Sequence, residues 1–521
     1  VDKAAKNRIF IHNPAAWDPD GDSLAYKLTP CTGENGEPIP GFEFPDGVSM
    51  NEITGDMIWD RPTETGVFNV AILIEEWRQG IKIGQLTRDL QIEVYETDNM
   101  PPDIFSEETI CVEAGQLISV EIKVTDSDGD GLVLTPLGGA FELDQPAVFN
   151  QTGMSGDTLL GVVEWQTNCA HIRQQPYLLV IKAEDTTADV TLADMHNVRV
   201  WVNGPATQIV ENEPTNNSVL LRWFAPGCDV TGYEVYRRSS SYAWVFDECL
   251  TGVPSEAGYT LIASLPADSL SYTDTDNGNG LLQGFVYCYR VVPRYGSASG
   301  YASGEVCVEL VRGIPVITNV SVEQTDVVNG KIFVAWSKPT EIDTITYSGP
   351  YFYHVFRAEG IGQVAFPDAP VAIFNNLSDT LFVDSMLNTK TKAYSYKIEL
   401  HNVSGMVSAP MIASQLWLNT VGADSQVSLL VDKFVPWLNS KYEFFEVHDE
   451  GEQYIGESSD ETFLHTNLQN LNEYSYRVRS VGQYTQSGFI NPIVNYSQIQ
   501  VGVPVDSIPP AVPELNVFAD C

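Results

Sequence analysis

The sequence predicts an all-β protein built from tandem β-sandwich modules. Short runs rich in Val, Ile, Tyr and Phe alternate apolar with polar residues, as in NVAILIEEW (69–77), SVEIKVTD (119–126) and KIFVAWS (331–337). Clusters of Gly, Asn, Asp and Pro interrupt these runs about every ten residues, a spacing typical of sandwich strands. Helical periodicity is almost absent. We therefore expect short strands throughout and very little helix.

Proline-rich joints divide the 521 residues into units of ordinary sandwich size. These joints are TDNMPPD (97–103), VNGPA (202–206), RGIPV (312–316) and DSIPPAVP (506–513), with a softer boundary at WLNTVGAD (417–424). The first module is expected to be incomplete at its N-terminus, because strand-like residues begin at once. The expected shape is an elongated string of five sandwiches, followed by the start of a truncated module. The predicted boundaries are 1–98, 99–204, 205–313, 314–417, 418–504 and 505–521.

The chain is strongly acidic, with 69 Asp and Glu against 28 Lys and Arg and a formal net charge of -41. A surface of this charge repels nucleic acid and anionic lipid, and it attracts cations. No apolar run reaches the length of a membrane-spanning helix. We therefore expect neither nucleic acid as a partner nor a membrane span.

The second half of the chain repeats one aromatic unit. A Tyr-x-Tyr core followed by a basic and an aliphatic residue occurs as YCYRV (287–291), YSYKI (394–398) and YSYRV (474–478). Upstream of the first two, a strand ending in Trp223 or Trp336 precedes a second strand that contains tyrosine. A tryptophan packed on a tyrosine strand of the opposite sheet is how a fibronectin type III sandwich fills its core. The third, fourth and fifth modules are therefore expected to be fibronectin type III-like.

These aromatic side chains are expected in the cores of the modules, and stacking on glycans is the less favoured alternative. The first tyrosine of each pair (Tyr287, Tyr394 and Tyr474) fits a tyrosine corner. The fifth module departs from the pattern, because Val431 stands where a tryptophan is expected. We expect Trp437 to replace the missing bulk in that core.

Two aspartate-rich turns, DPDGDSLAYKL (18–28) and DSDGDGLVL (126–134), are candidate calcium sites. Alternate carboxylates in an extended turn can point at one centre, as calcium requires. An EF-hand is excluded, because its twelfth position holds Thr29 in the first turn and Leu137 in the second. The alternative is that Asp and Gly only form the turn before a strand. The predicted ligands are Asp18, Asp20, Asp22, Asp126, Asp128 and Asp130. A loose resemblance of the linker between the first two modules to the Asp-Asn linker of cadherins implies two further ligands, Asp98 and Asn99.

Eight cysteines are scattered through strand-like segments, and none forms a C-x-x-C pair. This pattern favours disulfides in an oxidising compartment over a zinc site. Cysteines that share a module are the expected partners, which leaves Cys31 and Cys521 unassigned. The predicted bonds are Cys111–Cys169, Cys228–Cys249 and Cys288–Cys307.

Residues 47–77, GVSMNEITGDMIWDRPTETGVFNVAILIEEW, resemble the cadherin-like and immunoglobulin-like modules of bacterial surface proteins. The resemblance lies in a hairpin around Thr54–Gly55 and a turn around Thr65–Gly66. It implies that the first module is a cadherin-like or Ig-like sandwich and that the second is Ig-like. In cadherins, an Asp-Asn linker helps to enclose calcium, which Asp98–Asn99 loosely resembles.

Several stretches, taken in order, resemble secreted multidomain proteins of Bacteroidota that are associated with gliding motility and exported by the type IX secretion system. Such proteins end in a sorting domain that these residues lack, so we expect it beyond Cys521. The resemblance implies an extracellular or outer-membrane location, with the secretion translocon and other surface proteins or glycans as partners. The stretches are HNPAAWDPDGDSLAYKL (12–28), WQTNCAHIRQQPYLLVIKAED (165–185), GCDVTGYEVYRR (227–238), GVPSEAGYTLIA (252–263), VPWLNSKYEFFEV (435–447) and SVGQYTQSG (480–488).

The leading functional hypothesis is a non-catalytic surface adhesin or stalk. The alternative is a set of spacer modules in a secreted enzyme whose catalytic domain lies outside these residues. An enzyme within the chain is disfavoured, because the seven histidines are scattered and no HExxH, GxSxG or phosphate-loop motif occurs. His171 lies two residues from Cys169, yet a cysteine held in a disulfide cannot act as a nucleophile.

Overall fold

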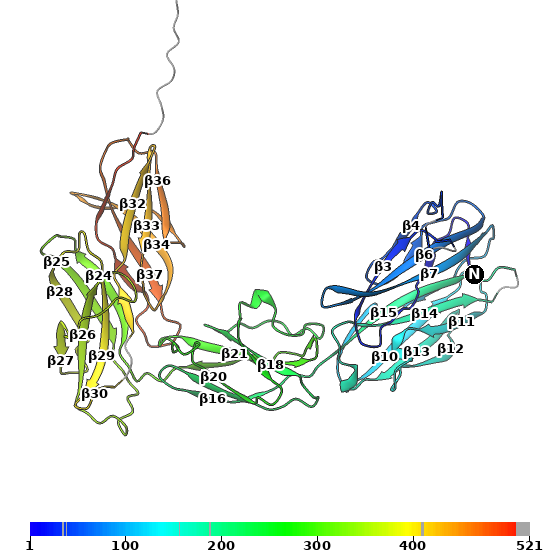
Figure 1. Cartoon of the computed structure of the whole chain (residues 1–521), viewed down its shortest axis with the longest axis horizontal. Coiled ribbons are helices and arrows are strands. Elements are labelled where there is room, and N and C mark those ends of the chain that lie inside the picture. The colour runs from blue at the N-terminus through cyan, green and yellow to red at the C-terminus, as the bar shows by residue number, and fades with distance from the viewer. Residues whose placement is uncertain (34–35, 38, 156, 187–188, 408–410, 507–521) are drawn as a thin grey trace, which may run out of the picture.

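The computed structural model describes residues 1–506 except 34–35, 38, 156, 187–188 and 408–410. The strands form five successive pairs of sheets (Figure 1). Buried apolar side chains lie between the two sheets of each pair. This confirms the predicted class of tandem β-sandwiches. Nearly all of the predicted truncated module at 505–521 lies outside the described residues. The helical elements of the described residues are the short 3₁₀ turns η1 (Gly139–Phe141), η2 (Cys169–His171) and η3 (Ser255–Ala257).

The first sandwich contains β1 (Asp2–Ala5), β2 (Phe10–His12), β3 (Ser23–Thr29), β4 (Val48–Met50), β5 (Met57–Trp59), β6 (Gly66–Arg78) and β7 (Ile81–Tyr95). A four-stranded sheet in the order β1-β7-β6-β3 packs on a three-stranded sheet, β2-β5-β4. Met57 and Trp59 of β5 are buried against Val70, Ile72 and Ile92 of the larger sheet. The aspartate turn at 18–22 leads directly into the edge strand β3.

The second sandwich contains β8 (Asp103–Phe105), β9 (Thr109–Glu113), β10 (Leu117–Thr125), β11 (Leu132–Leu137), β12 (Val148–Ser155), β13 (Thr158–Gln166), β14 (Tyr177–Asp185) and β15 (Ala193–Asn203). Its sheets run β12-β13-β10-β8 and β11-β14-β15-β9. Ile118, Val120, Ile122 and Val124 of β10 are buried and the residues between them are exposed, which is the alternation that the sequence predicts. β9 pairs in parallel with β15 and lies at the edge of its sheet.

The last three sandwiches share one strand order. The third contains β16 (Ile209–Pro214), β17 (Val219–Trp223), β18 (Gly232–Arg238), β19 (Thr260–Pro266), β20 (Ser271–Asp274), β21 (Val286–Tyr295), β22 (Ala298–Ser299) and β23 (Val306–Glu309). The fourth contains β24 (Val316–Gln324), β25 (Gly330–Ser337), β26 (Tyr351–Glu359), β27 (Ala372–Phe374), β28 (Leu381–Leu387), β29 (Tyr394–Asn402), β30 (Gly405–Met406) and β31 (Ile412–Ser414). The fifth contains β32 (Trp417–Ala423), β33 (Gln426–Asp432), β34 (Leu438–His448), β35 (Gly451–Ser458), β36 (Thr462–Thr466), β37 (Tyr474–Gln483), β38 (Ile493–Tyr496) and β39 (Gln500–Gly502).

In each of these three, a three-stranded sheet faces a five-stranded sheet. In the third sandwich the order is β16-β17-β20 against β19-β18-β21-β22. The fourth sandwich repeats this order with every strand number raised by eight, and the fifth repeats it with every number raised by sixteen. The fifth strand of the larger sheet (β23, β31 or β39) pairs with the same central strand in each case. The repeat that the Tyr-x-Tyr motif predicts is therefore also a repeat of topology, and its two-sheet arrangement is that of a fibronectin type III sandwich.

The predicted aromatic core is present in the third and fourth sandwiches. The rings of Trp223 and Tyr233 lie 5.5 Å apart, and those of Trp336 and Tyr353 lie 5.4 Å apart. All four side chains are buried, which supports core packing over stacking on glycans.

The tyrosine corner is confirmed in the third sandwich, where the Tyr287 hydroxyl donates to the carbonyl of Leu282 at 2.9 Å. In the fifth, the Tyr474 hydroxyl accepts a hydrogen bond from the backbone amide of Gln469 at 3.0 Å. Tyr394 of the fourth is buried and packs beside Arg357, without a hydrogen bond from its hydroxyl to any described residue. The tyrosine hydroxyl therefore bonds the backbone of the preceding loop in the third and fifth sandwiches, and it donates to a carbonyl there only in the third.

The fifth sandwich fills its core differently from the prediction. Trp437 is buried not in that core but in the cluster shared with the third and fourth sandwiches, where its ring lies 6.4 Å from that of Tyr484. Stacked Phe444 and Phe463, 4.9 Å apart, pack within the fifth core instead. The prediction that Trp437 replaces the missing tryptophan is therefore wrong, because the loop that carries it faces the neighbouring sandwiches.

The five sandwiches do not form the single line that the sequence predicts. The first two lie side by side (Figure 1), with β2 next to β15 and with Ala5 packed against Val190 and Leu192. The fourth and fifth also lie side by side, because β24 runs next to β38. The chain therefore turns back on itself at the proline joint of residues 97–103 and again at the softer boundary of residues 417–424, and the third sandwich connects the two pairs.

Candidate functional site

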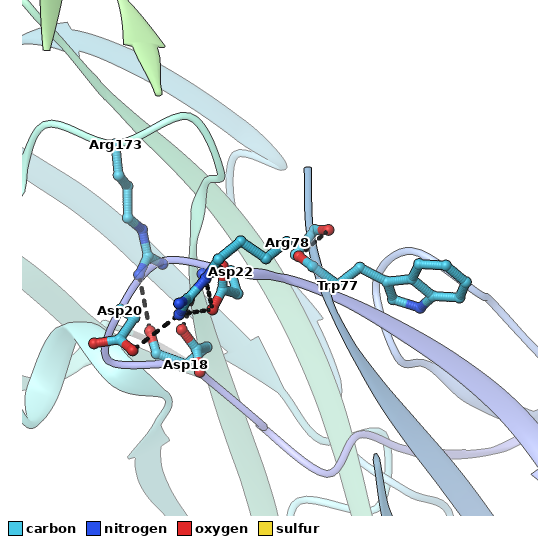
Figure 2. A network of polar contacts seen from close by, with 7 residues as sticks. Asp18, Asp20, Asp22, Trp77, Arg78 and Arg173 are labelled. Atoms are coloured by element: carbon cyan, nitrogen blue, oxygen red, sulfur yellow. Dashed lines mark hydrogen bonds and ion pairs between the residues drawn. The ribbon is translucent and has the colours of Figure 1, made fainter. Parts of the chain in front are cut away.

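The first aspartate turn is closed by an arginine from the neighbouring strand. The Asp18 side chain accepts a hydrogen bond from the backbone amide of Asp22 at 2.9 Å, which stabilises the turn ahead of β3. Arg78, at the end of β6, donates to Asp22 at 2.5 and 2.9 Å and to Asp20 at 3.1 Å (Figure 2). The hydrogen bond from Arg78 holds the pKa of Asp22 below its usual range. A side chain thus supplies the positive charge that the sequence interpretation assigned to calcium.

The first turn also gathers a group of three carboxylates. Asp18, Asp22 and Glu76 each place an oxygen within 4.8 Å of the others. Burial and the nearby charges of Asp18 and Asp22 raise the pKa of Glu76. Because Arg78 already binds the carboxylate of Asp22, a calcium ion would have to displace a guanidinium. The residues of this turn therefore do not fit calcium while Arg78 remains in place.

An arginine of the second sandwich reaches the same turn. Arg173 donates to the backbone carbonyl of Asp18 at 3.4 Å, as Figure 2 shows, and its guanidinium lies 3.6 Å from the centre of the Tyr177 ring. Burial lowers the pKa of Arg173, while the Tyr177 hydroxyl and Asp18 oppose that shift. The first turn is thus part of the contact between the first two sandwiches.

The second aspartate turn brings three carboxylates together without a basic partner. Asp126, Asp128 and Asp130 each place an oxygen within 4.8 Å of the others, and no Lys, Arg or His of the described residues forms an ion pair with them. Asp126 Oδ1 accepts hydrogen bonds from the backbone amides of Asp128 (2.8 Å) and Asp130 (3.2 Å). Asp126 is only 9% exposed, and its Oδ2 is buried with no hydrogen-bond partner in the described part of the chain. Such an oxygen is costly to bury unpaired, and a cation would satisfy it.

The linker between the first two sandwiches contacts this second turn. The backbone amide of Met100 donates to Asp128 Oδ2 at 2.7 Å. The side chain of Asn99 donates to Asp185 at 2.8 Å and to the carbonyl of Val190 at 2.9 Å. Asp98 is exposed and belongs to neither carboxylate group. Asn99 therefore ties the linker to Asp185, a buried carboxylate that no sequence motif marks.

A third set of acidic side chains lies between the first two sandwiches. Asp56 accepts hydrogen bonds from the side-chain amides of Asn13 (2.9 Å) and Asn197. Burial raises the pKa of Asp194 to about 6, and the negative charges of Asp103 and Asp56 add to this rise. The folded chain therefore favours the protonated form of Asp194, in which its repulsion by Asp56 is removed.

Two disulfides cross from the second sandwich to the third. Their pairs are Cys111–Cys249 and Cys169–Cys228, so the predicted bonds Cys111–Cys169 and Cys228–Cys249 are wrong. The physical reason is that all four cysteines lie where these two sandwiches meet. The predicted bond Cys288–Cys307 is present and joins the neighbouring strands β21 and β23. Cys31 is a buried free thiol, and Cys521 lies outside the described residues.

Backbone contacts complete the joint between the second and third sandwiches. The amide of Tyr301 donates to the carbonyl of Gly204 at 3.0 Å, and the side chain of Asn203 donates to the carbonyl of Glu248 at 2.8 Å. A Cβ atom on Gly204 would lie 2.1 Å from the ring of Tyr295, so only glycine permits this close approach. Covalent bonds, hydrogen bonds and close packing therefore fix the same joint.

His171 is structural in this arrangement. Its Nδ1 accepts a hydrogen bond from the backbone amide of Asn168 at 3.1 Å, which caps η2. The ring is buried and lies 4.9 Å from that of Trp165, and burial lowers its pKa. Since Cys169 is bonded to Cys228, the two residues do not form a nucleophile pair.

Comparisons with known proteins give no family for this chain. No protein-family model and no curated protein matches it. Among solved structures, a three-domain segment of titin shares 14% identity over 58% of this chain and 96% of that one, with a TM-score of 0.19. Domains FN1–FN3 of chicken CNTN1 share 13% identity over 58% and 99% of the two chains, with a TM-score of 0.18. A two-domain fibronectin type III segment of chicken tenascin shares 17% over 40% and 97%, with a TM-score of 0.17.

At these TM-scores the likenesses carry no argument, and the assignment of β-sandwiches rests on the strand order described above. The chain is a multidomain β-sandwich protein, and its described residues contain three disulfides. None of the helical segments in the described residues is long or apolar enough to cross a bilayer.

Proposed function

We propose that this chain is a rigid, non-catalytic arm of an extracellular or surface-displayed protein, of the adhesin or stalk type. The observation that carries the proposal is the pair of disulfides between the second and third sandwiches. Sandwiches joined only by a short linker ordinarily move relative to one another. Two covalent bonds at separate points restrict that freedom and so fix the angle between the two sandwiches.

The other end of the arm is stiffened by contacts among the last three sandwiches. Tyr484 of the fifth packs its ring 5.6 Å from that of Phe285 in the third, and its hydroxyl donates to the carbonyl of Ile317 in the fourth at 2.6 Å. Tyr484 is buried. One side chain therefore joins three sandwiches, and the buried apolar cluster is continuous among them.

Particle imaging tests the rigid-arm proposal. Images of the oxidised chain should show one angle between the second and third sandwiches. After reduction of the disulfides, the same joint should show a spread of angles. A broad spread in the oxidised chain would contradict the proposal.

We propose calcium as a structural ligand of the second aspartate turn, held by Asp126, Asp128 and Asp130. The buried, unpaired Oδ2 of Asp126 and the contact between Asp128 and the linker support this assignment. Calcium would neutralise three carboxylates that have no basic partner in the described residues. Because Met100 binds the same turn, the ion would also stiffen the linker between the first two sandwiches.

Thermal unfolding of the whole chain in calcium and in chelator tests this site. Ligand at a hundredfold excess over Kd stabilises the native state by about 2.7 kcal/mol, so calcium should raise the Tm of the transition that includes the second sandwich. Asp128→Asn should reduce this response, whereas Asp98→Asn, a matched change at an exposed linker position, should leave it intact. An identical Tm in calcium and in chelator would contradict the site.

We further propose that the protein is exported by the type IX secretion system of a Bacteroidota cell and acts in gliding motility or surface attachment. The six stretches that resemble such cargo support this, as do the disulfides, which form outside the reducing cytoplasm. An epitope-tagged full-length protein should reach the cell surface or medium in normal cells and accumulate inside translocon-deficient cells. Equal surface display in both strains would contradict the route.

A further inference from the structure

The last strand of the first sandwich has a long edge without a partner. β7 runs from Ile81 to Tyr95, but β1 pairs only with its last four residues, Ile92–Tyr95. Residues 81–91, the free half of β7, therefore have β6 on one side and no strand of the described residues on the other. Apart from half-buried Gly84 and buried Leu90, these residues are exposed. An open edge of this length is a template for pairing with another strand.

The backbone of this edge carries unpaired hydrogen-bonding groups. The amide of Lys6 donates to the carbonyl of Tyr95 at 2.8 Å, so the backbone groups of Tyr95 face β1. Because such groups alternate between the two sides of a strand, those of Gln85, Thr87 and Asp89 face the same side. Their amides and carbonyls bond to no group of the described residues there. All three residues are exposed, so a partner strand can reach them.

The side chains of the free half of β7 differ from the acidic surface of the chain. Lys82 and Arg88 against Asp89 give this stretch a net charge of +1, whereas the whole chain carries -41. Large apolar side chains also point to solvent here, namely Ile81 (68% exposed), Ile83 (48%) and Leu86 (65%). Two copies of so acidic a chain repel over most of their surface, and this edge is free of that repulsion.

The second sandwich shows what covers the corresponding edge. Its sheet β9-β15-β14-β11 repeats the order β1-β7-β6-β3, so β15 corresponds to β7. β9 likewise pairs in parallel only with the end of β15, Arg199–Asn203. The rest of β15 contacts the first sandwich, where the amide of Asn13 donates to Met195 Sδ at 3.1 Å. The side chain of Asn197 donates to Asp56 there. A neighbouring sandwich therefore covers this half strand in one module, and the same half strand is open in the other.

We propose that the free half of β7 pairs with the same half strand of a second copy of this chain, in an antiparallel contact with two-fold symmetry. A second copy cannot offer the β2 side of its first sandwich, because its own second sandwich covers that side. With Thr87 on the two-fold axis, Gln85 lies opposite Asp89 of the partner subunit, and Leu86 lies opposite the partner subunit's Arg88. No like charges face each other in this register. The contact closes on itself, so it joins two arms and no more.

Analytical ultracentrifugation of the whole chain tests the proposal. Pairing along one edge buries less surface than a permanent dimer, so we expect a reversible dimer to form between roughly 1 and 100 µM. Leu86→Lys places a like charge opposite Arg88, and Thr87→Pro removes an edge amide that does not face β6. Each variant should weaken dimerisation by about tenfold or more. The matched control is Leu117→Lys, at a leucine of the second sandwich that is 60% exposed, which should dimerise like the unaltered chain.

Hydrogen–deuterium exchange locates the contact. The amides of residues 81–91 should exchange several-fold more slowly in the dimer than in the dilute monomer, because pairing protects them. Melting curves of the variants separate loss of pairing from loss of fold. Three results would overturn the proposal: a chain that stays monomeric throughout, a dimer that survives both edge variants, and a dimer without added protection at residues 81–91. Particle imaging of the joint between the second and third sandwiches tests the rigid arm independently of dimerisation.

Discussion

The joint between the first two sandwiches and the joint between the second and third are held by different forces. At the first, charged and polar side chains such as Asp56, Asp194 and Arg173 meet across the contact. At the second, two disulfides and the close approach of Gly204 to Tyr295 fix the geometry. The difference teaches that one chain can hold one joint by polar side-chain contacts and the next joint by covalent bonds. The expected effects below test this contrast, from the largest to the smallest.

Breaking the outer disulfide should have the largest effect on stability. Cys111–Cys249 closes a loop of 138 residues, and a bridge of this span stabilises by about 4 to 5 kcal/mol in the chain-entropy account. Cys249→Ser should therefore lower the urea midpoint of the transition that contains the second and third sandwiches. Cys31→Ser, which removes a buried free thiol, is the control and should change that midpoint much less. Equal midpoints for Cys249→Ser and the unaltered chain would show that the bridge does not constrain the joint.

The first joint should respond to pH through Asp194. The pKa of this carboxyl is about 6 in the folded chain against a usual value of 3.8, so the folded state favours the protonated form. The contribution of Asp194 to folding stability is then greatest at a pH below its pKa in the unfolded chain. It falls as the pH rises from about 4 to about 6. Asp194→Asn should remove this loss and raise stability by roughly 1 to 3 kcal/mol above pH 6. Asp98→Asn is the control, and a pH profile that Asp194→Asn leaves unaltered would contradict the account.

Making the first aspartate turn resemble the second tests the contrast with a smaller expected effect, a shift of only a few degrees in Tm. Arg78→Ala removes the basic partner of Asp20 and Asp22, so the first turn becomes like the second. The variant should melt at a lower temperature in chelator than the unaltered chain, and calcium should restore part of the loss. Lys3→Ala is the control, because Lys3 forms no ion pair with any described residue. This variant should show neither effect. A variant Arg78→Ala that is indifferent to calcium would show that this turn forms without any cation.

Features set by short-range patterns could be predicted from the sequence. The alternation in β10 follows from the period of two in SVEIKVTD, and the tyrosine corner of Tyr287 involves a residue only five positions away. The bond Cys288–Cys307 was predictable because adjacent strands of one sandwich bring its cysteines together. In each case the partners lie in the same sandwich.

Features set by docking between sandwiches could not be predicted. The pairing of Cys111 with Cys249 depends on how the second sandwich meets the third, and no local pattern reports that contact. Arg78 lies 56 residues from Asp22 and reaches it only because β6 pairs with β3. Trp437 faces the neighbouring sandwiches for the same kind of reason. Cys169 lies in the turn η2 and Cys228 lies between β17 and β18, so neither occupies a strand-like segment of the kind that the sequence interpretation assigned to the cysteines.

The central claim, that the second and third sandwiches are covalently locked, is tested most directly by stretching single chains held at their two ends. While Cys111–Cys249 is intact, the 138-residue interval between its cysteines cannot extend. In Cys249→Ser the inner bridge Cys169–Cys228 still closes 59 residues. The gain in unfolded length is then the difference between 138 and 59 residues, or roughly 280 Å at the reach of an extended chain.

The account predicts this gain of roughly 280 Å for Cys249→Ser over the unaltered chain. If Cys249 were instead bonded to Cys228, only the 21 residues between those positions would be released, a gain of roughly 75 Å. The shorter gain, or no gain at all, would contradict the locked joint.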